Sequence, residues 1–352
     1  MNCDFYTFFK CFVFFFSPFN ILFLNFFIHQ GVESKKIELI SADFKDVHDS
    51  SAFVDKTMFL DHFMRDEAEH MVITAPKGFG KTSILNMVSA FFNIRTDEAG
   101  NPLNETTSEF YNIFTSSVKI SKFPKVINAN YGKFPVLALN FNEIDTQDEI
   151  TFSASFRSFL ERTFSKFPYL ERSKNLTSVD KFKLSALLRS INNLELSSLI
   201  GFGKILTRML FEHFRTKCVL LVDDYDVPFW RALEAKNSTE ANSIIKNVAL
   251  FIGRLVRTNG KHVARSLLTG CRKVAAKHLT TADNLQYYSI FDESPYWEFY
   301  GFTEDEIEFL RGKFNISAKS LELDVRDSVF DGNRRIYNTS SVLRKLKEKS
   351  VT

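Results

Sequence analysis

Short apolar runs alternate with longer amphipathic segments along most of this chain. Residues 70–75, 135–141, 219–222 and 266–269 are short and rich in aliphatic side chains, as is typical of buried strands, and residues 287–291 are a fifth candidate. Residues 82–92 and 241–256 instead repeat their apolar positions at helical spacing. Strands that alternate with helices predict an α/β fold, in which a mainly parallel sheet is flanked by helices on both faces.

Three regions depart from this simple alternation. Residues 149–214 are helical in pattern, with breaks near Pro168 and Asn175, and predict a long helical insert. Residues 97–133 are polar and uneven, which indicates an excursion without long elements. Near the end, Thr303 starts a helix, and Glu306 stands at the position of a capping box. We therefore expect one domain over residues 33–300 and a short helical C-terminal extension over residues 301–352.

The first 32 residues have a composition of their own. Phenylalanine occurs 40 times in the 352 residues, and in this segment residues 11–28 form a nearly unbroken apolar run behind Lys10. A basic edge, an apolar centre and a polar exit are the order of a secretory signal peptide, which would place the protein in the secretory pathway or outside the cell. Two alternatives remain open: a membrane anchor, because the run nears the length that spans a bilayer, and a misassigned start codon, which would leave the protein cytoplasmic.

Composition and charge bear on the class of function. The chain is 45% hydrophobic and 25% charged, with a formal net charge of +3 at pH 7. No basic block is interleaved with aromatic residues, so we expect no nucleic-acid surface. Cys218 begins one predicted strand and Cys271 follows the next. In neighbouring parallel strands these thiols would lie at opposite ends, too far apart for a disulfide, so we predict that both are free.

The candidate chemistry begins between the first predicted strand and the helix that follows it. Residues 73–83 read ITAPKGFGKTS, and Gly80-Lys81-Thr82 is the tail of a phosphate-binding loop, although Ala75 stands where its first glycine belongs. In such a loop, backbone N–H groups and a helix N-terminus face one anion. The lysine binds the β- and γ-phosphates of ATP, and the hydroxyl binds Mg²⁺. The predicted ATP-binding residues here are Lys77, Gly78, Phe79, Gly80, Lys81, Thr82 and Ser83.

The same four letters, GFGK, recur at residues 201–204. No predicted strand precedes this second string, and Ile205 stands where a phosphate-binding loop needs a hydroxyl. We interpret it as a bend between helices.

Polar residues also follow the strands at 219–222 and 266–269. Asp223 would hold Mg²⁺ together with Thr82, as a Walker-B carboxylate does, and Asp224 would act as general base for the attacking water. ATPases of this type more often have glutamate at the second position, and the shorter aspartate would slow hydrolysis. Thr269 could sense the γ-phosphate of ATP from the end of its strand. Two cations that could also reach this phosphate follow it, Arg272 and Lys273.

These motifs, in this order, resemble those of the AAA-ATPase-like domain family. The resemblance is carried by FVDKTMF, APKGFGKT, NYGKFPVLALNF, VLLVDDYDVP, SLLTG and FYGFTEDEI, and it extends from residue 53 to the C-terminal end. It implies a P-loop NTPase fold related to the archaeal and STAND-type ATPases. Family members usually read RPRRFGKT at the loop, so the missing first glycine is normal among them, and DEYD where this chain has DDYD. The segments FDGN and IYNTSS resemble the family's YDGY and YNPWS.

Many bacterial members of that family carry a C-terminal nuclease-like domain of the PD-(D/E)xK type, and we expect this chain, which stops at Thr352, to lack it. The residues and the resemblance together predict a protein that binds ATP and Mg²⁺ and hydrolyses ATP slowly or not at all. Two alternatives remain open. One is a non-catalytic P-loop scaffold, and the other is a nucleotide-gated switch that binds an unknown protein partner through residues 149–214.

Overall fold

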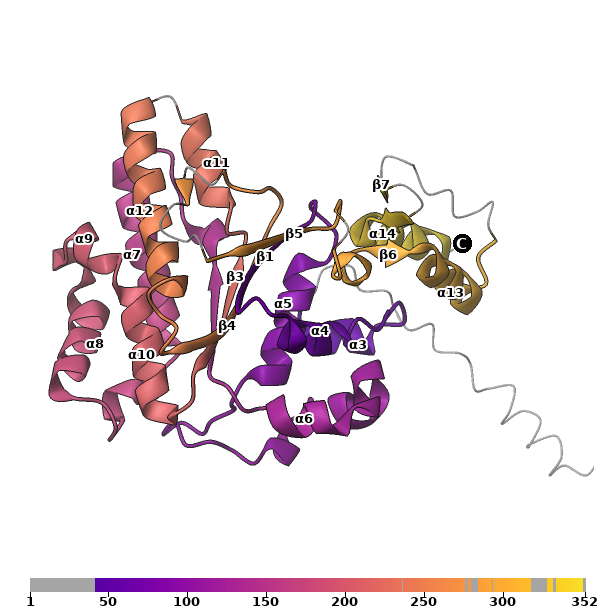
Figure 1. The fold of residues 1–352 in the computed structure, drawn as a ribbon, viewed down its shortest axis with the longest axis horizontal. Helices are drawn as coiled ribbons and strands as arrows, with labels where there is room; N and C mark the ends of the chain where they lie inside the picture. Colours follow the sequence, from indigo (N-terminus) through magenta and orange to yellow (C-terminus); the bar gives the residue numbers. More distant parts are fainter. Residues whose placement is uncertain are drawn as a thin grey trace, which may run out of the picture.

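The computed structural model describes residues 42–235, 237–275, 278–279, 284–292, 294–317, 328–331 and 334–350. The predicted leader, residues 1–32, lies outside the described residues. Five parallel strands form the central sheet in the order β2-β3-β4-β1-β5 (Figure 1). Their bounds are His70–Thr74 (β1), Val136–Asn140 (β2), Cys218–Asp223 (β3), Val263–Gly270 (β4) and Gln286–Ser289 (β5). The predicted α/β fold with a mainly parallel sheet is confirmed, and each strand overlaps its expected range.

Helices cover both faces of this sheet, because successive side chains of a strand point to opposite faces and both sets are apolar. On β3, Leu220 and Val222 pack with helices α7 (Glu149–Ser165), α10 (Phe202–Phe214) and α12 (Ser238–Val256). Val219 and Leu221 pack instead with α4 (Phe59–Arg65) and α5 (Lys81–Phe92). Figure 1 shows the two helical layers on either side of the sheet. The unbroken apolar run at residues 219–222 therefore reflects a strand that is buried on both faces.

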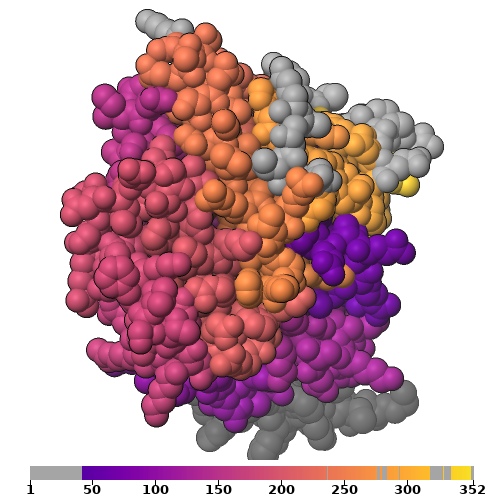
Figure 2. Space-filling model, turned by 60° about the vertical axis from the view of Figure 1, so that its left-hand side comes forward, coloured from indigo at the N-terminus to yellow at the C-terminus, as the bar shows by residue number. Residues whose placement is uncertain are grey.

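The predicted helical insert is present, with its breaks where the sequence placed them. After α7 comes a 3₁₀ turn at Pro168–Arg172, and then α8 (Ser178–Ser190), α9 (Leu196–Leu199) and α10. The second GFGK string lies where α9 meets α10, as the predicted bend. Gly203 packs so closely against α12 that an added Cβ would lie 2.9 Å from the Phe251 ring. Figure 2 shows the insert as a continuous pink surface on one side of the molecule.

Shorter helices complete the domain. α3 (Phe44–Asp49) precedes α4, α6 (Pro124–Asn130) lies near the end of the 97–133 excursion, and α11 (Val227–Glu234) follows β3. The rest of the excursion holds only short 3₁₀ and π turns, at Glu105–Thr107, Ile113–Ser117 and Lys119–Lys122. Cys218 begins β3, Cys271 follows β4, and both thiols are free, as predicted. In the part of the chain that the structure describes, no helix is long and apolar enough to cross a membrane.

The C-terminal extension contains strands as well as the expected helices. β6 (Phe302–Thr303), β8 (Arg334–Tyr337) and β7 (Ser328–Asp331) form an antiparallel sheet in that order, next to α13 (Glu304–Phe314) and α14 (Thr339–Ser350). The predicted capping box is formed, since the Glu306 N–H donates to Thr303 Oγ1 at 3.3 Å. The description of the extension as helical was therefore incomplete. Strands of two to four residues are too short to display an alternating pattern.

Candidate functional site

The predicted phosphate-binding loop connects β1 to α5, which begins at Lys81. Gly78 and Gly80 both adopt left-handed backbone conformations, with φ values of 87° and 83°. Residues with a Cβ rarely adopt this region, so glycine permits the sharp path of the loop at these two positions. Gly80 stands at the N-cap of α5 and offers no side chain to the first turn of the helix. The free N–H groups of that turn therefore point out of the helix toward the loop.

The backbone carbonyls of the loop are hydrogen-bonded, whereas its backbone N–H groups are left free by the described residues. Every carbonyl from residue 75 to residue 80 accepts a hydrogen bond, from Lys81 Nζ (to Ala75 and Pro76), Asn338 (to Lys77), Ser340 (to Gly78), Gly301 (to Phe79) and Ile84 (to Gly80). The N–H groups of residues 77–82, in contrast, donate to none of the described residues. A run of free N–H groups ahead of a helix N-terminus is the arrangement that binds phosphate.

Lys81 lies folded across the loop, with only 7% of its surface exposed. Its Nζ donates to the carbonyls of Ala75 at 2.9 Å and Pro76 at 3.0 Å, and it contacts Cys271 Sγ at 3.3 Å. None of these three contacts is to a carboxylate, so among the described residues the structure gives the Lys81 ammonium no ion pair. A phosphate oxygen would be a stronger acceptor than either carbonyl.

Asp223 connects the loop to the end of β4. Its Oδ2 accepts a hydrogen bond from the Thr82 hydroxyl at 2.6 Å, and its Oδ1 accepts one from the Thr269 hydroxyl at 2.8 Å. β4 lies between β1 and β3, so Thr269 stands between the phosphate-binding loop and Asp223. Thr269 is fully buried. The Thr269 hydroxyl is therefore bonded to the Asp223 carboxylate and supports it. A direct contact between Thr269 and a phosphate stays a prediction.

The donor set at Thr82 and Asp223 fits Mg²⁺. This ion prefers oxygen ligands, and it commonly binds one or two carboxylates together with substrate phosphates and waters. Thr82 is exposed at its side of the contact, whereas Asp223 is buried beneath it. An ion between the loop and Asp223 could therefore take one oxygen from each residue while it faced a bound phosphate.

Asp224 has an unusual backbone and an unusual environment. Its φ is 52°, in the left-handed region that aspartate and asparagine tolerate better than most residues. Burial, followed by the neighbouring charge of Asp223, raises the pKa of its carboxyl group, and Lys81 opposes this shift. A raised pKa makes the carboxylate a better proton acceptor, provided that it is ionised at the working pH. The role of Asp224 as general base stays a prediction.

These residues surround a pocket of about 560 Å³. Among the predicted residues it is lined by Lys77, Gly78, Phe79, Gly80, Lys81, Thr82, Ser83 and Asp224. Asp223 and Thr269 lie below its surface. The rest of the wall includes Val47 from α3, Val54 from the segment between α3 and α4, and Phe302 and Leu343 from the C-terminal extension. The pocket thus has a polar end at the loop and an apolar end between the two termini of the described chain.

Sequence reasoning missed the role of Tyr225 and Asp226. The Asp226 carboxylate accepts hydrogen bonds from the N–H groups of Cys271 at 3.2 Å and Arg272 at 2.9 Å. The Tyr225 hydroxyl donates to the Arg272 carbonyl and accepts from the Val274 N–H, each at 3.1 Å. Both side chains therefore hold the segment after β4 that places Cys271 against Lys81. The DDYD string contains both residues, but the sequence predicted a role only for its first two positions, Asp223 and Asp224.

Arg272 and Lys273 do not line the pocket, in contrast to the expectation that they could reach a phosphate there. The Arg272 guanidinium lies over the Trp230 ring, 5.0 Å from its centroid, and the Lys273 ammonium lies 4.7 Å from the centroid of Tyr287. Cation–π contacts of this kind favour a cation over the face of the ring, so both side chains are held against these rings and not at the pocket.

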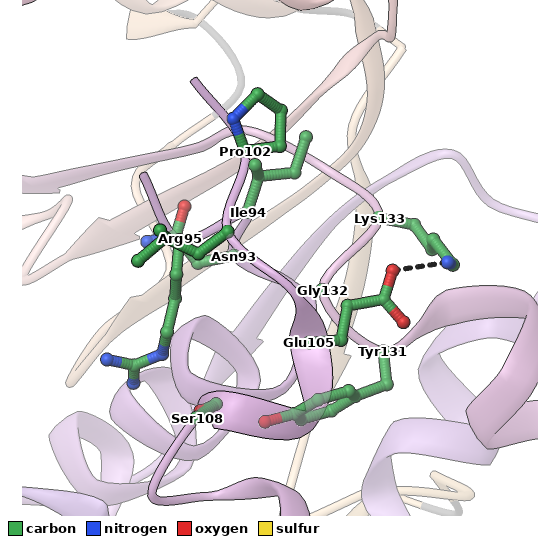
Figure 3. A pocket seen from close by; sticks show the side chains of 10 residues that line it. Asn93, Ile94, Arg95, Pro102, Glu105, Ser108, Tyr131, Gly132 and Lys133 are labelled. Atoms are coloured by element: carbon green, nitrogen blue, oxygen red, sulfur yellow. Dashed lines mark hydrogen bonds and ion pairs between the residues drawn. The ribbon is translucent and has the colours of Figure 1, made fainter. Parts of the chain in front are cut away.

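A second pocket, of about 130 Å³, lies in the excursion, between residues 93–108 and residues 131–133 (Figure 3). Its charged groups already have partners. Lys133 pairs with Glu105 across the pocket, as the dashed line in Figure 3 shows, and the Arg95 guanidinium lies 4.6 Å from the centroid of Phe110.

Comparison with known proteins gives one match. A family model described as "Predicted AAA-ATPase" matches residues 40–280, which include the loop, Asp223 and Thr269. No curated protein and no solved structure matches the chain. The match covers well over half of the sequence, and it agrees with the five-stranded parallel sheet and with the loop between β1 and α5. The chain therefore belongs to the AAA-ATPase-like family.

Proposed function

We propose that this protein binds ATP together with Mg²⁺ in the pocket at the carboxyl end of the sheet. The observation that carries the proposal is the contrast between the bonded carbonyls and the free N–H groups of the loop. All carbonyls of residues 75–80 are satisfied, whereas the N–H groups of residues 77–82 donate to none of the described residues. Membership of an AAA-ATPase-like family also suggests nucleotide binding.

Each predicted residue has a distinct role in this proposal. The N–H groups of the loop bind phosphate oxygens, and Lys81 exchanges its two carbonyl partners for the β- and γ-phosphates. Thr82 and Asp223 would hold Mg²⁺, which when bound neutralises charge on the phosphates. Thr269 keeps Asp223 in place, and the apolar end of the pocket, lined by residues such as Val54, accommodates the base.

We propose that hydrolysis is slow or absent. Asp224 would orient or deprotonate the attacking water, but its carboxylate is one methylene shorter than the glutamate that more often serves this purpose. A displacement of about 1 Å can lower a rate by on the order of 100-fold. Binding depends on the loop, Lys81 and Asp223, so it should be less sensitive than turnover to this difference.

The rival is a scaffold that has kept the fold without the chemistry, and a phosphate-release assay with and without Mg²⁺ separates the two. Slow Mg²⁺-dependent release that disappears in Asp224→Asn, with ATP affinity retained, would exclude the scaffold. Asparagine is the suitable replacement because it tolerates the left-handed φ of this position, whereas alanine would add backbone strain. If neither the wild-type protein nor the variant binds ATP, the proposed function is wrong.

One observation favours the nucleotide-gated switch as a second candidate. On α8 of the insert, Phe182 is 74% exposed and Val179 is 60% exposed, one helical turn apart. A partner protein could cover this apolar stripe. A partner captured equally well with and without ATP would argue against gating.

The cellular location bears on the choice between these candidates. We propose that residues 1–32 act as a signal peptide, with an anchor or a misassigned start as alternatives. Because ATP is scarce outside cells, a secreted protein would favour the scaffold. N-terminal sequencing of the mature protein would test the leader, and an intact Met1 on a protein in the cytoplasm would contradict it.

A further inference from the structure

The C-terminal extension is bonded directly to the phosphate-binding loop. Three successive loop carbonyls accept its hydrogen bonds: Lys77 from Asn338 Nδ2 at 2.8 Å, Gly78 from the Ser340 N–H at 3.1 Å, and Phe79 from the Gly301 N–H at 3.0 Å. Asn338 is separated from Lys77 by 261 positions in the sequence. The donors of these three bonds lie beyond residue 280, where the family match ends, whereas the acceptors lie inside the match.

The two ends of the Asn338 amide have different partners. Its Oδ1 accepts a hydrogen bond from the Ser341 N–H at 3.1 Å, which caps the first turn of α14, and its Nδ2 donates to the Lys77 carbonyl. Asn338 does not line the pocket, whereas its neighbours Thr339 and Ser340 do. An effect of Asn338 on a bound phosphate must therefore pass through the loop.

The extension and the loop also fit closely in space. A Cβ added to Gly78 would lie 2.6 Å from Asn338 Oδ1, and one added to Gly301, whose φ is 76°, would lie 2.8 Å from the Phe79 ring. The left-handed glycine of the loop thus leaves room for the asparagine. The contact restricts the loop on the side that faces away from the free N–H groups.

Other contacts dock the extension without help from the loop. Lys56 Nζ donates to both carboxylate oxygens of Glu306, at 2.7 and 2.6 Å, and this pair is largely buried. Ala52 and Val54 pack in one apolar cluster with residues of the extension, namely Phe302, Ile307, Leu310, Val342 and Leu346. The extension therefore has anchors on residues 52–56 that do not involve the loop.

We propose that Asn338 is a positioning residue for the phosphate-binding loop. With the N–H groups of Ser340 and Gly301 it forms a loop clamp, which fixes the carbonyls of residues 77–79 outward and so turns the N–H groups of the same peptides toward the phosphates. The proposal rests on the proposed function, because it assigns how that site is preorganised. By reciprocity, a nucleotide that orders the loop also strengthens the clamp and the N-terminal end of α14.

Asn338→Ser tests the clamp. Serine is also a good N-cap, so α14 keeps its cap, but its side chain is too short to reach the Lys77 carbonyl. The matched control is Asn237→Ser at the N-cap of α12, which has no contact with the loop. The full chain is titrated with ATP·Mg²⁺ and with inorganic triphosphate. We expect Asn338→Ser to bind both ligands roughly three- to tenfold more weakly, the effect of one hydrogen bond, and the control to bind as the wild type does.

A second measurement separates positioning from folding. In hydrogen exchange, ATP·Mg²⁺ should slow exchange of the amides of α14 in the wild type, and should slow it less in Asn338→Ser. Wild-type affinity in Asn338→Ser would overturn the clamp while leaving the proposed function intact. An equal loss of affinity in the Asn237→Ser control would also overturn the clamp. So would a loss of affinity for ATP but not for triphosphate, since that would indicate a contact with the base or ribose. If the wild-type protein binds neither ligand, the proposed function itself fails.

Discussion

The two threonines that donate to Asp223 should affect different properties of the protein when each is replaced by valine. Thr82→Val and Thr269→Val remove one hydroxyl each and keep the branched shape of the side chain. Thr269 is fully buried and donates to Oδ1 at 2.8 Å, whereas Thr82 is exposed and donates to Oδ2 at 2.6 Å. The Thr269 hydroxyl supports the folded protein, whereas the Thr82 hydroxyl is placed to become a ligand of Mg²⁺.

The magnitudes follow from these positions. A hydrogen bond to a charged acceptor contributes about 1.5–3 kcal/mol, so Thr269→Val should lower the free energy of unfolding by about that amount. Thr82→Val should lower it by about 1 kcal/mol or less, because the hydroxyl is open to water. Loss of even an indirect partner of a bound metal commonly weakens metal binding at least about tenfold, so Thr82→Val should weaken ATP·Mg²⁺ binding by at least that factor.

Two assays on the same samples measure the contrast. Urea unfolding gives the free energy of unfolding, and calorimetric titration gives ATP affinity with Mg²⁺ and with a chelator. In the chelator, the affinity of Thr82→Val should approach that of the wild type, because the lost interaction acts through the metal. The reasoning is refuted if Thr82→Val binds ATP·Mg²⁺ as the wild type does, or if Thr269→Val unfolds at the wild-type urea concentration.

Two further predictions concern buried polar groups near the site. Burial raises the pKa of Asp224 in the folded chain, so the free energy of unfolding of the wild type falls as the pH rises from the unfolded-state pKa through the folded-state pKa. Asp224→Asn should therefore be more stable than the wild type at pH 7 and should lose this advantage toward about pH 4. A difference in urea unfolding that stayed constant across this pH range would contradict the prediction. Tyr300 is fully buried and its hydroxyl has no partner among the described residues, so Tyr300→Phe should leave the free energy of unfolding unchanged or raise it by about 1 kcal/mol, whereas a loss of similar size in thermal or urea unfolding would reveal a partner.

Most of the sheet could be predicted from the sequence because its three central strands, β3, β4 and β1, are largely buried on both faces and therefore read as short apolar runs. The apolar run at residues 219–222 and the loop after residue 75 signal strand ends directly, and parallel strands bring such ends to one edge of the sheet. The contact between Thr82 and Asp223 followed from that rule. The place of β4 between β1 and β3 did not, since strand order is set by packing between distant segments, and it is what joins Thr269 to Asp223.

The contribution of the C-terminal extension could not be predicted in the same way. Its strands are two to four residues long, and no local pattern connects Asn338 with Lys77 across 261 positions. The segment IYNTSS was visible as a resemblance, but its hydrogen bonds depend on where the extension docks. Likewise, the second half of DDYD acts on the segment after β4, and this partner is known only once β3 and β4 are paired.

The measurement that tests the central claim most directly is thermal unfolding of the full chain with and without ATP·Mg²⁺. It should be made on the wild type, on Lys81→Ala, and on Lys204→Ala, which alters the same letter in the second GFGK string. A ligand at about 100 times its Kd stabilises the folded state by roughly 2.7 kcal/mol, a rise of several degrees in Tm. We predict this rise in the wild type and in Lys204→Ala, and its loss in Lys81→Ala. No rise in the wild type, or the same rise in Lys81→Ala, would contradict a nucleotide site at this loop.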